Sequence, residues 1–336
     1  MMKKTKVLLT VDIEHSMGGL FGKSRTKPVA AEKCIFCEYR GRSYGLGLII
    51  ETLKEYEIKA TFFVETEARH FFGDESLRQL IRYILQNGHD VQLHIHPIFR
   101  FFCSSLNKQT DSLCSYSLSE QTKIIKDAKE FLGYCGATDV CAFRAGNFIL
   151  NADTLRALKE NGIYFDSSFN CALRNNYDVQ IRGNVSNTVF EAAGLIVFPV
   201  TNIVETGFRL NKYRPLQICA ISSREFKNAI NFYVKNMLFS ITILTHPLEM
   251  TRSRSSQFTD MVPNAITIRR LRYLCRYLSE IRDKIDITTF SDLKRDYQLD
   301  DLKKQIADKN KGITYRSSCF DTGIRYIEQL TQEFYV

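Results

Sequence analysis

Short apolar runs alternate with longer segments of helical periodicity along most of this chain. Strands are predicted at 6–11, 60–64, 91–95, 140–144, 163–165, 195–198, 238–244 and 285–289. Helices are predicted at 46–56, 76–87, 117–131, 151–161, 224–236, 266–281 and 291–297, and two charged segments of helical period follow. Strands that alternate with helices form a parallel sheet with right-handed crossovers. The sequence therefore predicts an α/β fold, and 336 residues are an ordinary length for one α/β barrel.

Charged and imidazole side chains follow several of these predicted strands. They are Asp12, Glu14, His94, His96, Arg144, Asp166 and His246. The catalytic and binding residues of parallel α/β folds lie at the C-terminal ends of the strands. We therefore expect these side chains to lie at one end of the sheet.

The segment 88–97 holds three of the six histidines. Residues two apart on a strand point to the same face, so His94 and His96 would present two imidazoles side by side. Two converging neutral imidazoles are half of a transition-metal site. A lone His-x-His pair is also compatible with one core histidine and one solvated histidine. The other ligands must decide between these interpretations.

The net charge of +9 allows an anionic substrate, a membrane surface or nucleic acid as a partner. The helix at 266–281 is basic and amphipathic, which allows peripheral contact with an anionic membrane. A solvated outer helix of a barrel explains the same pattern and is favoured. Nothing beyond the charge indicates nucleic acid, and no apolar run reaches the roughly 18 residues that span a bilayer.

The ten cysteines show no regular spacing beyond Cys34-x-x-Cys37, and several lie in apolar runs. This usage favours reduced, buried thiols in a cytoplasmic protein. The lysine-rich start followed by an apolar run resembles a signal peptide, but Asp12 and Glu14 interrupt the run, which favours a strand. Cys34 and Cys37 could form half of a structural zinc site, although no second pair matches. The segment 16–45 around them has no clear period and predicts a long loop, which in a compact domain is usually functional.

Five short motifs occur in a recognisable order. They are Thr10-Val11-Asp12-Ile13-Glu14, then Gly88-His89-Asp90 through His94-Ile95-His96-Pro97, Phe143-Arg144-Ala145-Gly146, Asp166-Ser167-Ser168 and Leu244-Thr245-His246-Pro247. Together they resemble the polysaccharide deacetylase family, the NodB-homology fold of carbohydrate esterase family 4. The resemblance covers about residues 6–290. It implies a distorted (β/α) barrel with about seven parallel strands over residues 1–296, followed by a C-terminal helical extension at 297–336.

The resemblance also implies roles for the residues at the strand ends. Asp12 resembles the catalytic base, and His246 resembles the general acid. Glu14, His94 and His96 resemble the ligands of a divalent metal, with Zn first and Co, Mn or Fe as alternatives. Arg144 resembles the cation that orients the base, and Asp166 resembles the carboxylate that tunes His246.

Four departures, one of them the Thr-His-Pro of the fifth motif, place the chain in a divergent branch of that family. Ile13 separates the two carboxylates, which leaves the roles of Asp12 and Glu14 open to exchange. Ile98 stands where the second imidazole ligand is usual, so His96 must substitute for it. The third motif lacks the usual proline and aromatic residue after Arg144.

The leading hypothesis is a metal-dependent hydrolase that removes an N-acyl group, in the first instance acetyl, from an amino sugar. The absence of an evident export signal favours a surface-polysaccharide precursor, and the basic charge suits a nucleotide- or diphosphate-linked sugar. Two alternatives remain: a related amidase acting on a non-sugar carbon–nitrogen bond, and a non-catalytic glycan-binding descendant of the barrel. The sequence does not indicate an oligomeric state.

Overall fold

The computed structural model describes residues 4–22, 26–179, 186–206, 212–307 and 312–334. Residues 23–25 of the predicted long loop, and 308–311 and 335–336 of the C-terminal extension, lie outside this part of the chain. Residues 180–185 and 207–211 lie outside it as well.

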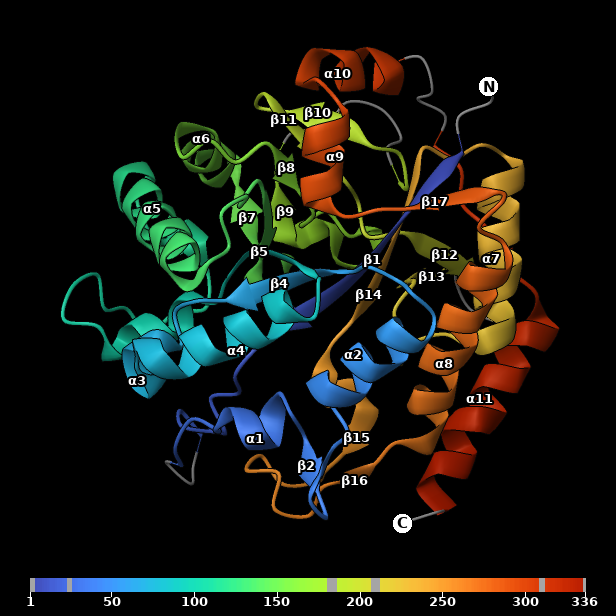
Figure 1. Ribbon diagram of the computed structural model, residues 1–336, viewed down its shortest axis with the longest axis horizontal. Helices are drawn as coiled ribbons and strands as arrows, with labels where there is room; N and C mark the ends of the chain where they lie inside the picture. Colours follow the sequence, from blue (N-terminus) through green and yellow to red (C-terminus); the bar gives the residue numbers. More distant parts are fainter. Residues whose placement is uncertain (1–3, 23–25, 180–185, 207–211, 308–311, 335–336) are drawn as a thin grey trace.

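The described chain contains a nine-stranded sheet with the order β10-β11-β8-β6-β5-β4-β1-β14, and β17 also pairs with β1 (Figure 1). The strands are β1 (Thr5–Ile13), β4 (Thr61–Glu65), β5 (Asp90–Ile95), β6 (Ala142–Ala145), β8 (Phe165–Asp166), β10 (Phe190–Ala192), β11 (Leu195–Val197), β14 (Ser240–Thr245) and β17 (Ile285–Ile287). All their pairings are parallel except that of β10 with β11. The predicted α/β fold is confirmed.

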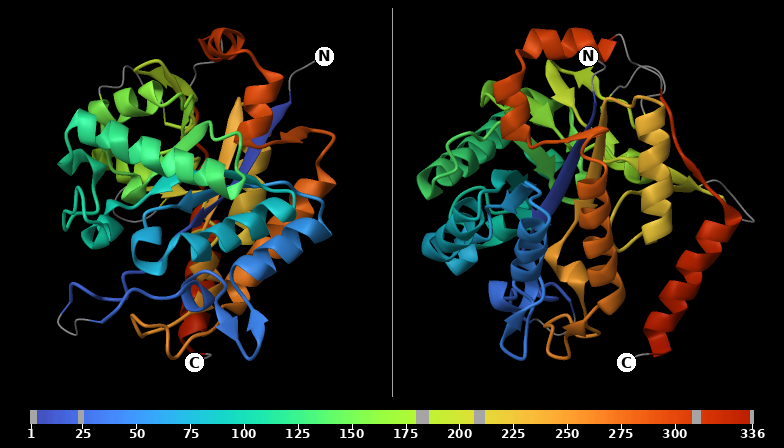
Figure 2. Two further views of the ribbon diagram at one scale, coloured as in Figure 1. Left: turned by 60° about the vertical axis from the view of Figure 1, so that its left-hand side comes forward. Right: turned by 45° about the vertical axis from the view of Figure 1, so that its right-hand side comes forward.

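Helices cover the outside of this curled sheet (Figures 1 and 2). They are α2 (Leu46–Glu55), α4 (Asp74–Gln86), α5 (Leu118–Cys135), α6 (Ala152–Glu160), α7 (Ser223–Lys235) and α8 (Ala265–Glu280). The helix α9 (Phe290–Asp296) instead lies at the N-terminal ends of β4 and β5. Ser117 and Glu120 form the capping box that their spacing predicts at the start of α5. Asn151 caps α6 in the same way.

Shorter elements connect this frame. They are α1 (Ala31–Cys34), α3 (Arg69–Phe72), β2 (Glu38–Tyr39), β3 (Arg42–Ser43), β7 (Leu150–Asn151), β9 (Tyr177–Asp178), β12 (Asn202–Glu205), β13 (Lys212–Pro215), β15 (Thr251–Arg252) and β16 (Val262–Pro263). The segment 16–45, predicted as a loop, thus contains one short helix and one short hairpin.

The barrel is distorted where the sheet should close. Between β14 and the strands at the other edge, the chain runs as irregular segments instead of a regular strand. Thr201 N–H donates to Thr242 O (3.0 Å), and Leu244 N–H donates to Leu216 O (2.9 Å). Single hydrogen bonds of this kind pair backbone groups at the free edge of β14. The expected distorted (β/α) barrel is confirmed.

Alternate residues of β1 face two different cores. Val7, Leu9 and Val11 belong to the main cluster between sheet and helices, whereas Leu8 belongs to a smaller cluster inside the barrel. Phe290 of α9 lies in that interior cluster, with its ring centroid 5.5 Å from Phe63 and 5.4 Å from Phe198. The interior below the strand ends is therefore packed with side chains, and Thr10, Asp12 and Glu14 continue the inward-facing row of β1 above it.

The C-terminal segment after α9 contains α10 (Leu299–Ala307), β18 (Arg316–Ser317) and α11 (Cys319–Phe334). It is not purely helical, because β18 adds a parallel strand to β12. Leu302 and Ile306 of α10 belong to the interior cluster. The boundary at 296/297 stays a prediction. No helix among the described residues has both the length and the apolar character needed to cross a membrane.

Candidate active site

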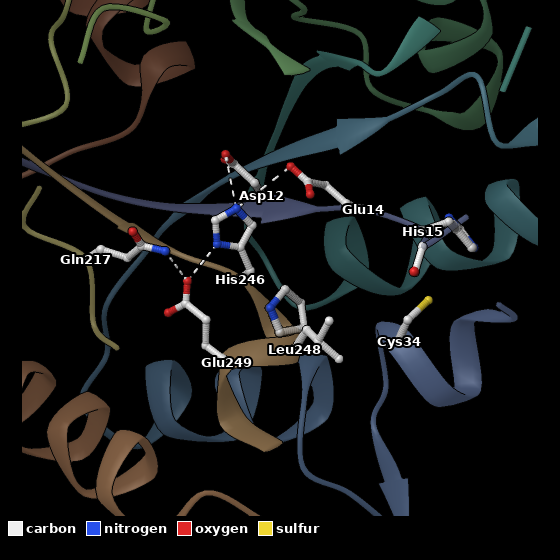
Figure 3. Close-up of a pocket in the computed structure, with 10 residues that line it drawn as sticks. Asp12, Glu14, His15, Cys34, Gln217, His246, Leu248 and Glu249 are labelled. Carbon is white, nitrogen blue, oxygen red and sulfur yellow. Dashed lines mark hydrogen bonds and ion pairs between the residues drawn. The ribbon is translucent and has the colours of Figure 1, made fainter. Parts of the chain in front are cut away.

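The polar side chains predicted to lie together meet at the C-terminal ends of three strands. Asp12 and Glu14 come from the end of β1, His94 and His96 from the end of β5, and His246 directly follows β14. Figure 3 shows Asp12, Glu14 and His246 pointing toward one another across the mouth of the barrel. A cavity of about 470 Å³ opens beside them, and His15, Cys34 and Leu248 are among the residues that line it.

Two imidazoles converge on one carboxylate oxygen. His94 Nε2 lies 2.8 Å from Glu14 Oε1, and His96 Nε2 lies 3.2 Å from the same atom. The centroids of the two rings are 4.9 Å apart. His96 therefore occupies the position of second imidazole although Ile98 stands at the usual place in the sequence.

The other nitrogen of each imidazole is held by an acceptor. His94 Nδ1 donates to the carbonyl oxygen of Arg144 (2.7 Å), and His96 Nδ1 donates to Asp111 Oδ2 (2.9 Å). With the proton on Nδ1, each Nε2 directs a lone pair toward Glu14. Two lone pairs facing a carboxylate repel one another unless a cation or extra protons lie between them.

The electrostatics of this group show the same need for positive charge. Burial opposes ionisation of Glu14, but the charge of His96 and the hydrogen bond from His94 outweigh it and hold the pKa of Glu14 well below its usual range. Burial also opposes the charged form of His96, but Glu14 and Asp111 outweigh it and raise the pKa of His96 well above its usual range. Glu14 and His96 thus each stabilise the charged form of the other.

The donor set fits a divalent transition metal. The donor atoms of Glu14, His94 and His96 lie within 4.8 Å of one another. Two imidazoles and one carboxylate, each imidazole with its second nitrogen anchored, are typical of catalytic zinc sites. Gly146 makes room for the cradle, since a Cβ there would lie 2.7 Å from His96 Nδ1.

Asp12 is held by a fully buried guanidinium. Arg144 Nη1 lies 2.5 Å from Asp12 Oδ1 and 2.9 Å from Thr10 Oγ1. Arg144 Nε donates to Ser167 O, and Nη2 donates to Ser167 Oγ. The second oxygen of Asp12 lies 3.8 Å from His246 Nε2. Arg144 therefore fixes Asp12 with one oxygen directed into the site.

The hydrogen-bond partner of His246 is Glu249, a residue that the sequence did not indicate. His246 Nδ1 lies 2.7 Å from Glu249 Oε1, and Glu249 in turn accepts hydrogen bonds from Gln217 Nε2 (2.6 Å) and Thr245 Oγ1 (3.0 Å). Burial lowers the pKa of His246, but the hydrogen bond to Glu249 and the charge of Glu14 outweigh it and raise the pKa to about 9. The imidazole is thus protonated at neutral pH and can serve as an acid.

The contact expected between Asp166 and His246 is not present. Asp166 Oδ1 accepts from Ser168 Oγ (2.5 Å), and Oδ2 accepts from Tyr177 OH (3.0 Å). Burial raises the pKa of Asp166 to about 6, against the effect of these hydrogen bonds. The strand end of β8 directs this carboxylate toward its own turn, so Glu249 occupies the place expected for Asp166.

Asp111 and Glu249 are the two site residues that the sequence analysis missed. Glu249 lies three residues after His246 in the turn Pro247–Met250, a spacing that could have pointed to it. Asp111 lies in the connection between β5 and α5, where it also accepts from Asn147 Nδ2 (2.6 Å). No local pattern in that connection marks Asp111 as a partner of His96.

Residues 46–165 match a family model described as "Polysaccharide deacetylase". Among solved structures, a protein assigned to the polysaccharide deacetylases of Mycobacterium smegmatis has a TM-score of 0.52, with 15% identity over 94% of each chain. A 4-alpha-glucanotransferase of Thermococcus litoralis has a TM-score of 0.53, with 12% identity over 88% of this chain and 41% of the other. A family 4 carbohydrate esterase of Streptomyces lividans, in complex with acetate, has a TM-score of 0.40, with 12% identity over 86% of this chain and 94% of the other. No curated protein matches the sequence.

The barrel alone does not define the reaction, because a glucanotransferase shares it. The family match adds a similarity to polysaccharide deacetylases over residues 46–165. This similarity agrees with the resemblance of the five motifs. The matched residues include His94, His96 and Arg144, whereas Asp12, Glu14 and His246 lie outside the match.

Proposed function

We propose that this protein is a metal-dependent deacetylase that removes the acetyl group from an amino sugar in a surface-polysaccharide precursor. One observation carries the proposal. His94 and His96, each anchored through Nδ1, direct Nε2 at Glu14. Beside them lie a buried, arginine-held Asp12 and a protonated His246. This arrangement brings a ligand set, a base and an acid together at the strand ends.

The proposed roles follow from the contacts. Glu14, His94 and His96 would hold the cation, with Zn first and Co, Mn or Fe as alternatives. When bound, such an ion supplies Lewis-acid polarisation of the acyl oxygen and favours ionisation of a water molecule. Asp12 rather than Glu14 acts as the base, because Arg144 occupies one oxygen of Asp12 while Glu14 faces both imidazoles.

Amide hydrolysis at this site balances with three proton transfers. Asp12 takes a proton as the oxygen of water forms its bond to the acyl carbon. His246 gives its Nε2 proton to the nitrogen as the carbon–nitrogen bond breaks, so that acetic acid, which ionises in water, and a free amine leave. The proton on Asp12 then returns to His246 Nε2, which lies 3.8 Å from Asp12 Oδ2. Glu249 keeps the other His246 proton on Nδ1 and stabilises the imidazolium. Asp166 is proposed as a positioning residue, because Ser168 links it to the backbone of Ala145, the residue after Arg144.

The substrate and the setting are proposals of the same kind. The net charge of +9 supports a nucleotide- or diphosphate-linked sugar. The ten cysteines are all free thiols, which supports a reducing compartment such as the cytoplasm. The test is acetate release from N-acetylated sugar nucleotides, sugar diphosphates and simple amides by the metal-loaded protein. Release from simple amides alone would favour the non-sugar amidase, and glycan binding without any release would favour the non-catalytic descendant.

Metal binding is expected to stabilise the fold. At a free Zn²⁺ concentration of 100 times Kd, the free energy of unfolding should rise by about 2.7 kcal/mol, because the ion binds only the native arrangement of ligands. Calorimetry of chelator-treated and Zn-loaded protein measures this rise. The control is His94→Ala, which should show no metal-dependent shift. An equal shift in wild type and variant would place the ion elsewhere.

Asp111→Asn is expected to weaken metal affinity by about 10–100-fold, the usual effect of losing the partner of a metal-bound imidazole. Asparagine can present either its amide oxygen or its amide N–H to His96 Nδ1. The proton of the imidazole is then no longer held on Nδ1, and the ring is no longer fixed in one orientation. Competition with a chromogenic chelator measures the affinity. Asp153→Asn, an exposed substitution on α6, is the matched control and should leave the affinity unchanged. Equal affinity in Asp111→Asn and wild type would remove Asp111 from the site.

A further inference from the structure

The C-terminal helix α11 has its charged and apolar sides reversed relative to an ordinary surface helix. Its described carboxylates and its arginine point inward. Arg325 is fully buried between Glu205 (2.9 Å) and Glu225 (3.3 Å), and Asp321 lies 2.6 Å from Arg224 Nε. The outward side presents Phe320 and Ile327, which are 65% and 63% exposed. Such large apolar groups in water mark a contact surface.

Three arginines of helix α8, which contacts α11, are also exposed to solvent. Arg269, Arg272 and Arg276 of α8 share one exposed helix face, because they are three and four residues apart. Arg270 of α8 binds Glu328 of α11 (2.6 Å), and Arg269 approaches the same carboxylate (3.9 Å). Figures 1 and 2 show both helices on the same side of the molecule. We call this surface, made of these three exposed arginines with Phe320 and Ile327, the α8/α11 face.

We propose that the α8/α11 face docks this protein onto an anionic lipid bilayer. Guanidinium groups bind lipid phosphates with paired hydrogen bonds, and phenylalanine and isoleucine side chains enter the boundary between headgroups and acyl chains. The excess of positive charge on the chain adds a long-range attraction to the same surface. Glu280 lies 3.7 Å from Arg276, and Glu328 lies 3.9 Å from Arg269, so this contact must tolerate both carboxylates.

A second copy of the chain fits this face less well. A two-fold dimer would place the same patch on both partners, so the three arginines of one copy would face those of the other. Like charges in such an interface oppose association, whereas an anionic surface removes the repulsion. The positive charge of the α8/α11 face therefore favours lipid over self-association.

Vesicle sedimentation tests the proposal with the full chain. Vesicles of phosphatidylcholine with 30 mol% phosphatidylglycerol are expected to bind the protein at low salt, and pure phosphatidylcholine vesicles are not. The variant Arg269→Gln/Arg272→Gln/Arg276→Gln should lose affinity by on the order of tenfold to a hundredfold. The variant Phe320→Ser/Ile327→Ser should lose at least about tenfold. The charge-matched control is Lys123→Gln/Lys126→Gln/Lys159→Gln, on α5 and α6, which should bind like wild type.

Three results would overturn the proposal. The first is no binding of wild type to the anionic vesicles, and the second is an equal loss in the control. The third is a concentration-dependent dimer in light scattering that Phe320→Ser/Ile327→Ser abolishes, which would assign the face to a second copy. Each variant is checked for wild-type melting and metal content, so a failure of the proposed catalytic function does not affect the outcome.

Discussion

His246→Gln should lower kcat for deacetylation by about 10²–10⁴-fold, the usual contribution of a general acid. Glutamine retains a polar group near Glu249 but cannot deliver a proton to the leaving nitrogen. The side chain is a quarter exposed, and it does not anchor either imidazole of the metal cradle. Metal content and melting temperature should therefore stay close to wild type. Steady-state kinetics, metal analysis and calorimetry on the same preparation measure the three quantities.

Glu249→Gln tests whether His246 acts as a general acid, because this variant keeps the His246 side chain in the cavity and changes its pKa. The carboxylate of Glu249 raises the pKa of His246, so its removal should move the alkaline limb of the rate profile to lower pH. The sign follows because the acid must carry its proton, and a lower pKa means that the proton is lost earlier as the pH rises. Unchanged kcat in His246→Gln, or an unmoved alkaline limb in Glu249→Gln, would contradict the assignment of His246 as the acid.

Arg144→Met is expected to lower the free energy of unfolding by about 3–5 kcal/mol, the cost of breaking a buried ion pair from one side. Both partners are essentially inaccessible to water, so Asp12 would keep a buried charge without compensation. The Oγ and carbonyl oxygen of Ser167 would each also lose a donor. Urea denaturation followed by circular dichroism measures the change.

Two further variants serve as controls for the stability loss expected in Arg144→Met. Arg156→Met removes an arginine that is 63% exposed and paired with Asp153, and such a surface pair contributes about 0–1 kcal/mol. The double variant Arg144→Met/Asp12→Asn should recover part of the stability, because it removes the stranded carboxylate charge. A loss in Arg144→Met no larger than that in Arg156→Met would show that the buried pair does not stabilise the barrel.

The sequence located the parts of the site that local periodicity controls. Residues two apart on an extended strand share a face, so the sequence alone places His94 with His96, and Asp12 with Glu14, on common faces. The frame of strands and helices was accessible for the same reason, since apolar period and caps such as Ser117–Glu120 are local signals.

The partners of these side chains were less accessible, because they depend on how loops return to the barrel. Asp111 reaches His96 from a connection without regular period, and no signal in 103–117 indicates where that chain turns. The assignment of Asp166 to His246 followed the order of motifs. It did not foresee that Ser168 and Tyr177 occupy both oxygens of Asp166.

The position of β1 in the sheet has a consequence for how the protein reaches its native state. β1 carries Asp12 and Glu14 and pairs with β14 and β17, more than 200 residues later in the chain. Only β4 can join it early. Pairings of such long sequence separation form slowly, because the loop between the strands must close first. The two carboxylates of the site therefore reach their final surroundings late in folding, after β14 and β17 have paired with β1.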